Sequence, residues 1–289
     1  MRILILSDGK KGHENQSLGL AEAILRRREG SYEISRIEDA PLGPQNSHQI
    51  NLIIAAGHGT HPFLIRSARR HRCPSVVIMK PSLPSFLFSH CLVPEHDLKL
   101  GKKTPKNYIP TKGALNRISE TIPEKEAKGL IMLGGPSKHF TWQTEPLLEA
   151  IASIVLSHPE LIWTVGDSRR TPESVLPELA EKCLPLSIAS HKEATGTWLM
   201  DQLLASQVAW ITPDSTSMLS EALTAGCKLG TLPLPAKDTR LSRAHDQLAK
   251  EAWLTPFAHY DTNATLPAPP YPLHETARCA EILLDKLAP

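Results

Sequence analysis

Short apolar runs alternate with segments of helical periodicity along this chain. In the first half, the apolar runs predict β-strands at residues 3–6, 32–37, 52–55 and 76–79. Over residues 14–28 and 60–71, apolar positions recur every three or four residues, which is typical of helices that bury one face. Because strands and helices alternate, the pattern predicts βαβ units, a parallel sheet and helices on both of its faces.

The section from residue 80 to residue 123 interrupts this alternation. It is rich in proline and contains only short apolar runs, at residues 90–93 and 108–109. At its end, the segment 118–128 is polar and carries Pro123, so it predicts a linker between two domains.

A second series of strands and helices follows the linker. Strands are predicted at residues 129–133, 161–165, 208–211 and 229–232, and helices at residues 144–157, 172–182, 197–205, 216–225 and 241–253. The proline-rich stretch 267–272 predicts an extended spacer, followed by a last helix over residues 273–287. We therefore expect an N-terminal α/β domain over residues 1–121, a C-terminal one over residues 122–272, and a cleft between them.

Composition limits which binding partners and which cellular compartment are expected for this protein. The 289 residues carry a formal net charge of +2, too small to indicate nucleic acid as a partner, although Arg66, Arg69, Arg70 and Arg72 could form a local basic surface. Five scattered cysteines predict neither a zinc site nor a disulfide framework. The first apolar run is too short for a signal peptide, and no stretch approaches the ~18 apolar residues of a membrane span. We expect a soluble cytoplasmic protein, with peripheral contact at the inner membrane face left open.

Ligands of open parallel sheets bind outside the carboxyl ends of the strands, so the residues that follow each predicted strand are candidates for chemistry. The first strand is followed by Ser-Asp-Gly-Lys-Lys-Gly-His-Glu-Asn-Gln at residues 7–16, an open loop with two glycines. His13 stands at the start of the next helix, where an imidazole could act as a general base near neutral pH. The alternative is a histidine that only caps or solvates the turn.

Gly57-His58-Gly59-Thr60, after the third strand, begins like a dinucleotide-binding loop. Pro62 stands where a third glycine would be needed, and no acidic residue ends a strand about 20 positions further on. The segment is therefore interpreted as a tight turn and not as a nicotinamide site.

Three strand ends in the second series carry groups that suit phosphate. They are Gly-Gly-Pro-Ser-Lys at 134–138, Ser-Arg-Arg-Thr-Pro at 168–172 and Thr-Pro-Asp-Ser-Thr-Ser-Met at 212–218. Together they offer close backbone approach, cationic side chains and a hydroxyl-rich helix start with positive dipole character. Each alone could be an ordinary turn or helix cap, but their coincidence at one sheet edge predicts a nucleotide diphosphate site. No Asp-x-Asp motif occurs, so a metal clamp of that type on the diphosphate is not expected.

These motifs also carry a resemblance to a known family. The chain resembles the glycosyltransferase-like proteins related to the plant mitochondrial-fission (elongated mitochondria) proteins, over nearly its whole length and least over residues 80–123. The resemblance rests on the three motifs above and on residues 7–23, which end in Ser-Leu-Gly-Leu-Ala-Glu-Ala. The segment from residue 212 is also similar to the donor-site helix of GT-B glycosyltransferases such as the lipid II-forming enzyme. One departure is Gly-Cys-Lys-Leu-Gly at 226–230, where the family has Gly-Lys-Pro and an apolar strand.

The resemblance implies a GT-B fold, in which two Rossmann-like domains with parallel sheets face each other across a cleft. It implies that the last segment, residues 273–289, packs back on the N-terminal domain. It further implies a nucleotide sugar as donor. We expect no other cofactor, and a glycan or lipid acceptor in the glycosylation of a bacterial envelope. By this analogy Glu221 binds the donor ribose and His13 is the catalytic base on the acceptor side.

Motifs and resemblance together define two groups of candidate residues. The donor-binding candidates are Gly134, Gly135, Ser137, Lys138, Ser168, Arg169, Arg170, Asp214, Ser215, Thr216, Ser217, Met218 and Glu221. The candidates on the acceptor side, around His13, are Asp8, Gly9, Lys10, Gly12, Asn15 and Gln16.

Two other functions compete with sugar transfer. A nucleotide-sugar 2-epimerase on the same fold would need further acid and base groups, for which His58, Glu95 and His96 are available. A non-catalytic interaction protein involved in membrane dynamics would retain the fold as a scaffold, as the role of the plant relatives implies.

Overall fold

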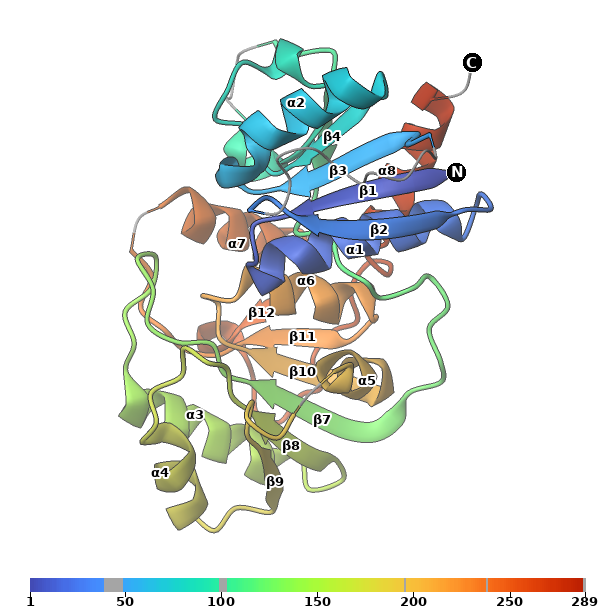
Figure 1. Ribbon diagram of the computed structural model, residues 1–289. Coiled ribbons are helices and arrows are strands. Elements are labelled where there is room, and N and C mark those ends of the chain that lie inside the picture. Colours follow the sequence, from blue (N-terminus) through green and yellow to red (C-terminus); the bar gives the residue numbers. More distant parts are fainter. Residues whose placement is uncertain (39–48, 99–102, 195, 238, 288–289) are drawn as a thin grey trace. The chain divides into compact units, whose positions relative to one another are not determined.

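The computed structural model describes residues 1–38, 49–98, 103–194, 196–237 and 239–287. The chain forms two compact units, one made of Met1–Ser119 together with His274–Pro289 and the other of Glu120–Leu273. Each unit is a β-sheet covered by helices (Figure 1). Among the described residues, no helix has both the length and the apolar character needed to cross a membrane.

The first unit contains a sheet whose described strands are all parallel. Its order is β2-β1-β3-β4-β5-β6. The strand order therefore reverses between β1 and β3, because β2 lies on one side of β1 and all later strands lie on the other. The strands are β1 (Arg2–Ser7), β2 (Ser31–Arg36), β3 (Leu52–Ala56), β4 (Ser75–Ile78), β5 (His90–Pro94) and β6 (Tyr108–Thr111).

Alternate side chains of these strands are buried on opposite faces of the sheet, as the two-residue period of a strand requires. Ile3 and Ile5 belong to a core with α1 (Lys11–Leu25) and α8 (Glu275–Leu287). Leu4 and Leu6 belong to a second core, which contains residues of α2 (His61–His71). The helices that follow β1 and β3 along the chain therefore cover different faces.

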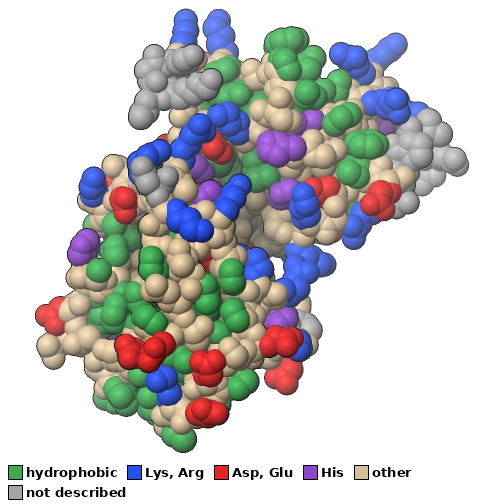
Figure 2. Space-filling view, turned by 90° about the vertical axis from the view of Figure 1, so that its left-hand side faces the viewer, with side chains coloured by type: hydrophobic (Ala, Val, Ile, Leu, Met, Phe, Trp, Pro, Cys, Tyr) green, Lys and Arg blue, Asp and Glu red, His purple; other side chains and the backbone are tan. Residues whose placement is uncertain are grey.

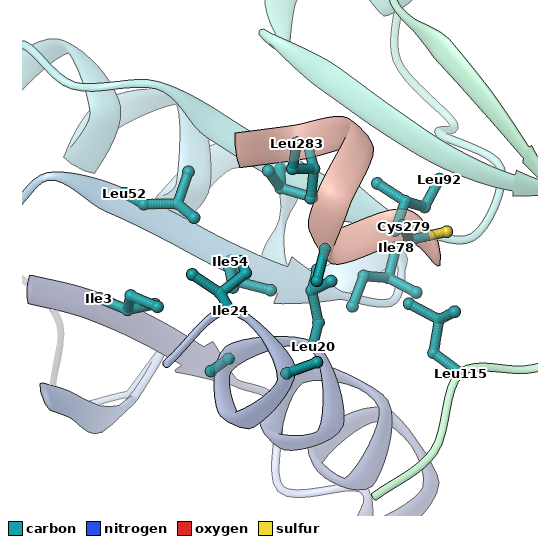
Figure 3. Close-up of a cluster of buried hydrophobic side chains, with 14 of the residues drawn as sticks. Ile3, Leu20, Ile24, Leu52, Ile54, Ile78, Leu92, Leu115, Cys279 and Leu283 are labelled. Carbon is teal, nitrogen blue, oxygen red and sulfur yellow. The ribbon is translucent and has the colours of Figure 1, made fainter. Parts of the chain in front are cut away.

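Helix α8 completes the first unit although it is the last element of the chain. It packs against α1 and contributes Cys279, Ala280 and Leu283 to the core, each with no exposed surface. Figure 3 shows Leu283 and Cys279 of α8 in one cluster with Leu20 of α1 and with strand residues such as Ile54 and Ile78. The core of the first unit is thus completed by a helix that follows the whole second unit in the sequence.

The second unit has a sheet with the order β12-β11-β10-β7-β8-β9, again parallel throughout the described residues. Its strand order reverses between β7 and β10. The strands are β7 (Glu126–Met132), β8 (Ile162–Gly166), β9 (Leu186–Ala189), β10 (Ser206–Ile211), β11 (Lys228–Thr231) and β12 (Thr255–Pro256).

Helices pack around this second sheet in two sets. Residues of α3 (Thr144–Ser157) and α4 (Val175–Glu181) share a core with Trp163 and Trp210. Helices α5 (Trp198–Ala205) and α6 (Thr216–Thr224) contact each other, and both contact β10. Helix α7 (Arg240–Lys250) begins with a capping box formed by Thr239 and Ser242.

The predicted α/β class with two parallel sheets is confirmed. The structure differs from the predictions in three places. The proline-rich section contains two further strands, β5 and β6, and Pro110 is accommodated because β6 lies at the sheet edge, where a missing N–H removes fewer ladder bonds. Strand β9 was not predicted, because an edge strand that is partly exposed has a weak hydrophobic pattern. The segment 118–128 is also less of a linker than expected, since β7 begins at Glu126.

Replacing Leu283 by Ala should destabilise the first unit by about 2–5 kcal/mol, because it leaves a cavity where α8 meets the core. Hydrogen exchange followed by mass spectrometry would show faster exchange of amides in α1, α8 and the first sheet. The control is Leu156→Ala on α3, since that side chain is 62% exposed. Equal effects of both substitutions on the first unit would contradict the packing of α8.

Candidate functional site

The loops that follow β7 and β10 are joined at the point where the strand order of the second sheet reverses. Thr212 Oγ1 accepts a hydrogen bond from the N–H of Gly134 at 2.6 Å. Asp214 Oδ2 accepts one from the N–H of Gly135 at 3.0 Å. Two segments that lie 78 residues apart in the sequence are therefore held side by side at the carboxyl edge.

Asp214 is the central anion of this edge. Its side chain has no exposed surface, and its Oδ2 lies 2.7 Å from Nη1 of Arg170, whose side chain is 46% exposed. A buried carboxylate is tolerated when it is paired and hydrogen-bonded. Asp214 also lies two residues before the first residue of α6, where negative charge is favourable for the helix dipole. Its carboxylate serves to hold the loops together.

Gly134 and Gly135 make this close approach of loops feasible. A Cβ atom added at Gly134 would lie 2.3 Å from Asp214 Oδ2, and one at Gly135 would lie 2.0 Å from the backbone oxygen of Arg170. The space that the two glycines leave is filled by neighbouring loops of the protein. The sequence predicted close approach here, and the structure identifies protein groups as what approaches.

The loop that follows β8 joins the same framework. Ser168 Oγ donates a hydrogen bond to the carbonyl oxygen of Gly134 at 3.0 Å. Thr171 Oγ1 lies within hydrogen-bond distance of the carbonyl oxygens of Leu133 and Gly134, and accepts a bond from the N–H of Ser168 at 2.9 Å. The structure therefore brings together all three loops that the sequence placed at one sheet edge.

The start of α6 is the part of this framework best suited to an anion. In any α-helix the first N–H groups have no acceptor within the helix. Ser215 precedes α6, but its side chain makes no capping hydrogen bond, and the N–H of Leu219 is bonded to Ser215 O at 3.1 Å. Ser217 and Glu221 are one turn apart and so lie on the same face. This face of α6 carries a hydroxyl above a carboxylate.

Cationic side chains surround the three loops. Lys138 and Arg169 are exposed and form no ion pair with any residue that the structure describes. Ser137 has a local role, because its Oγ accepts hydrogen bonds from the N–H groups of His139 and Phe140 at 3.2 and 3.1 Å. Of the three cations predicted for this site, Lys138 and Arg169 therefore remain available to a ligand, whereas Arg170 is paired with Asp214.

A histidine–aspartate pair at this edge was missed by sequence analysis. Nδ1 of His191 lies 2.8 Å from Asp167 Oδ2, and the backbone N–H of His191 donates to the other oxygen of the same carboxylate. Asp167 directly follows β8, and His191 follows β9 by two residues. The pair could have been found only by assigning β9, whose pattern is weak.

In the first unit, Asp8 and His13 form a pair at the reversal between β1 and β3. Nδ1 of His13 lies 2.9 Å from Asp8 Oδ2 and 3.1 Å from Oδ1. The side chain of His13 is 22% exposed and that of Asp8 is 7% exposed. Asp8 also accepts a hydrogen bond from the N–H of Lys10, and Lys10 Nζ lies 3.5 Å away. His13 is thus oriented by a carboxylate and is not a solvated loop residue.

The charge state of Asp8 fixes which nitrogen of His13 carries the proton. Burial raises the pKa of Asp8, but the hydrogen bonds from His13 and the N–H of Lys10, and the charges of both residues, outweigh it and lower the pKa below 3.8. Asp8 is therefore ionised near neutral pH. Because a carboxylate can only accept hydrogen bonds, Nδ1 of His13 must carry the proton and donate a hydrogen bond to Asp8. When the imidazole is neutral, Nε2 is therefore the acceptor nitrogen, as a general base requires.

Gly57 forms the wall behind this pair, in addition to the tight turn predicted from the sequence. A Cβ atom at Gly57 would lie 2.4 Å from the ring of His13, and its φ of +90° is a conformation that side chains rarely adopt. The turn is held by a bond from Thr60 Oγ1 to the carbonyl oxygen of Gly57 at 2.7 Å. Figure 2 looks toward this edge of the unit and shows histidine side chains in its upper part.

The other candidates on the acceptor side are less uniform. Gly9 has a φ of +78° and allows the turn around Asp8, whereas Gly12 is exposed at the first turn of α1. Asn15 is half-buried. Gln16 is buried, and its amide nitrogen donates to the carbonyl oxygen of Gly12 at 3.4 Å. Asp8, Gly9 and His13 are therefore brought together, while Gln16 is part of the packing of α1.

The groups considered for epimerase chemistry also lie at carboxyl ends of the first sheet. His58 follows β3 and contacts the ring of His61 edge to face, with centroids 5.6 Å apart. Glu95 and His96 follow β5 in a short 3₁₀ turn, where His96 Nε2 lies 3.9 Å from Asp97 Oδ2. Within the described ranges, no group of three or more His, Cys, Asp or Glu side chains is arranged to hold a metal ion.

Residues 11–287 match the model of a family described as Mitochondrial fission ELM1. No curated protein matches the chain in sequence.

The fold is similar to those of several solved structures. One is the glycotransferase of kitacinnamycin, with a TM-score of 0.55 and 12% identity over 100% of this chain and 99% of that one. A second is a Listeria monocytogenes protein described as a UDP-N-acetylglucosamine 2-epimerase, with a TM-score of 0.57 and 11% identity over 98% and 94% of the two chains. A third is the E. coli heptosyltransferase WaaC with ADP, with a TM-score of 0.50 and 12% identity over 100% of both. At this identity the likeness shows the GT-B fold and nothing finer.

Replacing Gly57 by Ala should displace the ring of His13 and lower the stability of the first unit. The strain of a side chain in this backbone conformation alone costs about 1–3 kcal/mol. Gly59→Ala is the matched control two residues away, because a Cβ atom there meets nothing within 4 Å. Thermal unfolding and the NMR signals of the His13 imidazole measure the two effects. If both variants behave alike, the contact between Gly57 and His13 is contradicted.

Proposed function

The chain belongs to the mitochondrial fission ELM1 family, and from that premise we propose that it is a glycosyltransferase that uses a nucleotide diphosphate sugar. One observation carries the proposal. Each sheet has a polar constellation at the point where its strand order reverses, which is where open α/β sheets bind ligands. One constellation suits a diphosphate, and the other provides an oriented base.

The donor would bind to the second unit. The diphosphate would accept hydrogen bonds from the first N–H groups of α6, with Ser215, Thr216 and Ser217 around it. Lys138 and Arg169 would compensate its charge, because neither is held by an ion pair with a described residue. Glu221, one turn below Ser217, would accept hydrogen bonds from ribose hydroxyls.

Catalysis would require a base for the acceptor. Nε2 of His13 would take the proton of the acceptor hydroxyl while that oxygen attacks the anomeric carbon and the nucleoside diphosphate leaves. Asp8 would stabilise the imidazolium that forms, as the carboxylate of a catalytic triad does. The helix start of α6 would stabilise the charge that develops on the leaving diphosphate.

The likeness in fold to solved glycosyltransferases, one of them with ADP, supports this assignment. The acceptor is proposed to be a glycan or lipid hydroxyl, with the protein acting in the cytoplasm and at the inner membrane face.

A nucleotide-sugar 2-epimerase is the second candidate function. It is favoured by the likeness in fold to the Listeria monocytogenes protein and by His58, Glu95 and His96 at the carboxyl edge of the first sheet. Products formed without any acceptor distinguish the two, since an epimerase converts the nucleotide sugar alone. A non-catalytic interaction role, the third candidate, predicts that biological activity survives loss of both His13 and Glu221.

Nucleoside diphosphates should raise the melting temperature of the protein, because a ligand that binds only the native state stabilises it. The gain is about 2.7 kcal/mol when the ligand is at 100 times its Kd. Glu221→Ala should weaken this effect, whereas Glu178→Ala on the exposed side of α4 should not. Absence of any shift with uridine, guanosine and adenosine diphosphates at millimolar concentration would count against the donor site.

His13→Ala should lower turnover by about 10²- to 10⁴-fold, the usual contribution of a general base, and leave the nucleotide-dependent shift intact. Asp8→Asn should also reduce turnover, because an amide can donate to Nδ1 and reverse the tautomer of His13. Release of nucleoside diphosphate with a membrane lipid extract as acceptor source is the assay, and Lys11→Ala is the exposed control. Full activity of His13→Ala would refute its role as base.

A further inference from the structure

A pocket of about 380 Å³ lies at the edge of the first sheet where its strands begin, opposite the edge that carries Asp8 and His13. It lies between the end of α2 and the segment that leads into β5. Its lining is largely apolar and includes two serines and two arginines. The lining residues are Ile65, Ala68, Arg69, Arg72, Cys73, Pro74, Ser75, Leu87 and Ser89.

The lining residues other than the two arginines are uncharged. Ser75 and Ser89 bind each other reciprocally, since each backbone N–H donates to the other's Oγ at 3.1 Å. Burial raises the pKa of the Cys73 thiol to about 11, so no thiolate opposes an anion there. Two cationic side chains thus line the pocket among neutral groups.

The surface around the pocket is strongly basic. Arg66, Arg69 and Arg70 are neighbours on α2 because they are three and four residues apart. Arg72 ends the helix with a φ of +50°. All four are exposed, and none forms an ion pair with a described residue. The whole chain has a net charge of only +2, so this surface concentrates positive charge that the rest of the protein balances.

A fifth cation and an exposed aromatic ring extend this surface. Phe86 is 81% exposed, more than any other large hydrophobic side chain in the described part of the chain, and its neighbour Leu87 lines the pocket. Lys106 is exposed and precedes Asn107, whose amide nitrogen donates to the carbonyl oxygens of Ser85 and Phe88 at 2.7 and 3.0 Å.

Helix α2 explains part of this arrangement without any ligand. Cations in the last turn of a helix favour its dipole, which accounts for Arg69 and Arg70. That effect explains neither the exposed ring of Phe86 nor the position of Lys106, which belong to other segments. An aromatic side chain among unpaired cations is the composition of surfaces that lie at a lipid–water interface.

We propose that this basic–aromatic surface, made of Arg66, Arg69, Arg70, Arg72, Phe86 and Lys106, docks on a membrane that contains anionic phospholipid. A headgroup phosphate binds in the pocket between Arg69 and Arg72, because guanidinium groups bind phosphate oxygens in pairs. Arg66, Arg70 and Lys106 meet the negative surface, and Phe86 enters the interfacial layer. The proposal does not depend on nucleotide binding by the second unit.

Sedimentation with vesicles tests the docking directly. The full chain should bind vesicles of phosphatidylglycerol and phosphatidylcholine, bind pure phosphatidylcholine far more weakly, and dissociate as salt is raised. Each cation near the surface strengthens binding by about fivefold, so Arg69→Gln with Arg72→Gln should weaken it by roughly 25-fold. Arg26→Gln with Arg28→Gln removes the same charge from another exposed site of the first unit and should have little effect.

Phe86→Ala separates docking from simple charge attraction. It should weaken vesicle binding several-fold while leaving the salt dependence unchanged, whereas the double arginine variant should reduce that dependence. Melting temperature and its response to nucleoside diphosphates should stay as in the unaltered chain for both variants, which excludes misfolding and keeps this test apart from the proposed enzyme activity.

Three outcomes would overturn the proposal. They are equal binding to anionic and neutral vesicles, an equal loss from the double variant at Arg26 and Arg28, and stabilisation by inorganic phosphate through Arg69 and Arg72 without any vesicle binding. The last outcome would identify a pocket for a soluble phosphate.

Discussion

Within each of the two sheets, all described strands are parallel, and this constraint decides where chemistry can be located. Parallel strands place all their carboxyl ends at one edge of the sheet. Where the strand order reverses, the helices that follow two neighbouring strands cover opposite faces, so the loops diverge and leave room between them. In the first unit α1 and α2 do this after β1 and β3, and the pair of Asp8 and His13 lies at that point.

The second sheet shows how such a position is made rigid. Its three loops are tied by bonds of the protein itself, through Thr212, Asp214, Ser168 and Thr171. These residues form the framework itself. The buried carboxylate of Asp214 is stabilised there through Oδ2, which is paired with Arg170 and accepts a hydrogen bond from the N–H of Gly135. The groups that remain for a ligand are the first N–H groups of α6 and side chains at the rim. Residues that hold the candidate site together are therefore largely distinct from those proposed to contact the donor.

The two edges of the first sheet have different chemistry. The carboxyl edge carries an oriented histidine beside an ionised carboxylate. The amino edge carries a small apolar pocket bordered by arginines and an exposed phenylalanine. A surface for docking at the amino edge would leave the carboxyl edge accessible to substrates, since the strands of the sheet separate the two. The fold can thus support attachment and catalysis without competition for the same residues.

The sequence alone determined the strong elements. Continuous apolar runs such as those of β1, β3 and β10 are specified locally because buried strands must be apolar on both faces. The strand-end rule then located the loops around His13, Gly134 and Thr212, because polar residues after such runs stand out. Weak edge strands escaped this logic: β6 contains a proline and β9 is partly exposed, so neither has a clear pattern.

What only the tertiary structure decided is which partner each polar group has. Strand order, not sequence distance, brings Asp214 to Gly135 and Arg170, and Gly57 to the ring of His13. It also makes α8 part of the first unit, although helical periodicity says nothing about which core the helix joins. Local sequence fixes the conformation of a segment through propensity and burial pattern, whereas the charge state and orientation of a side chain depend on contacts made across the whole chain.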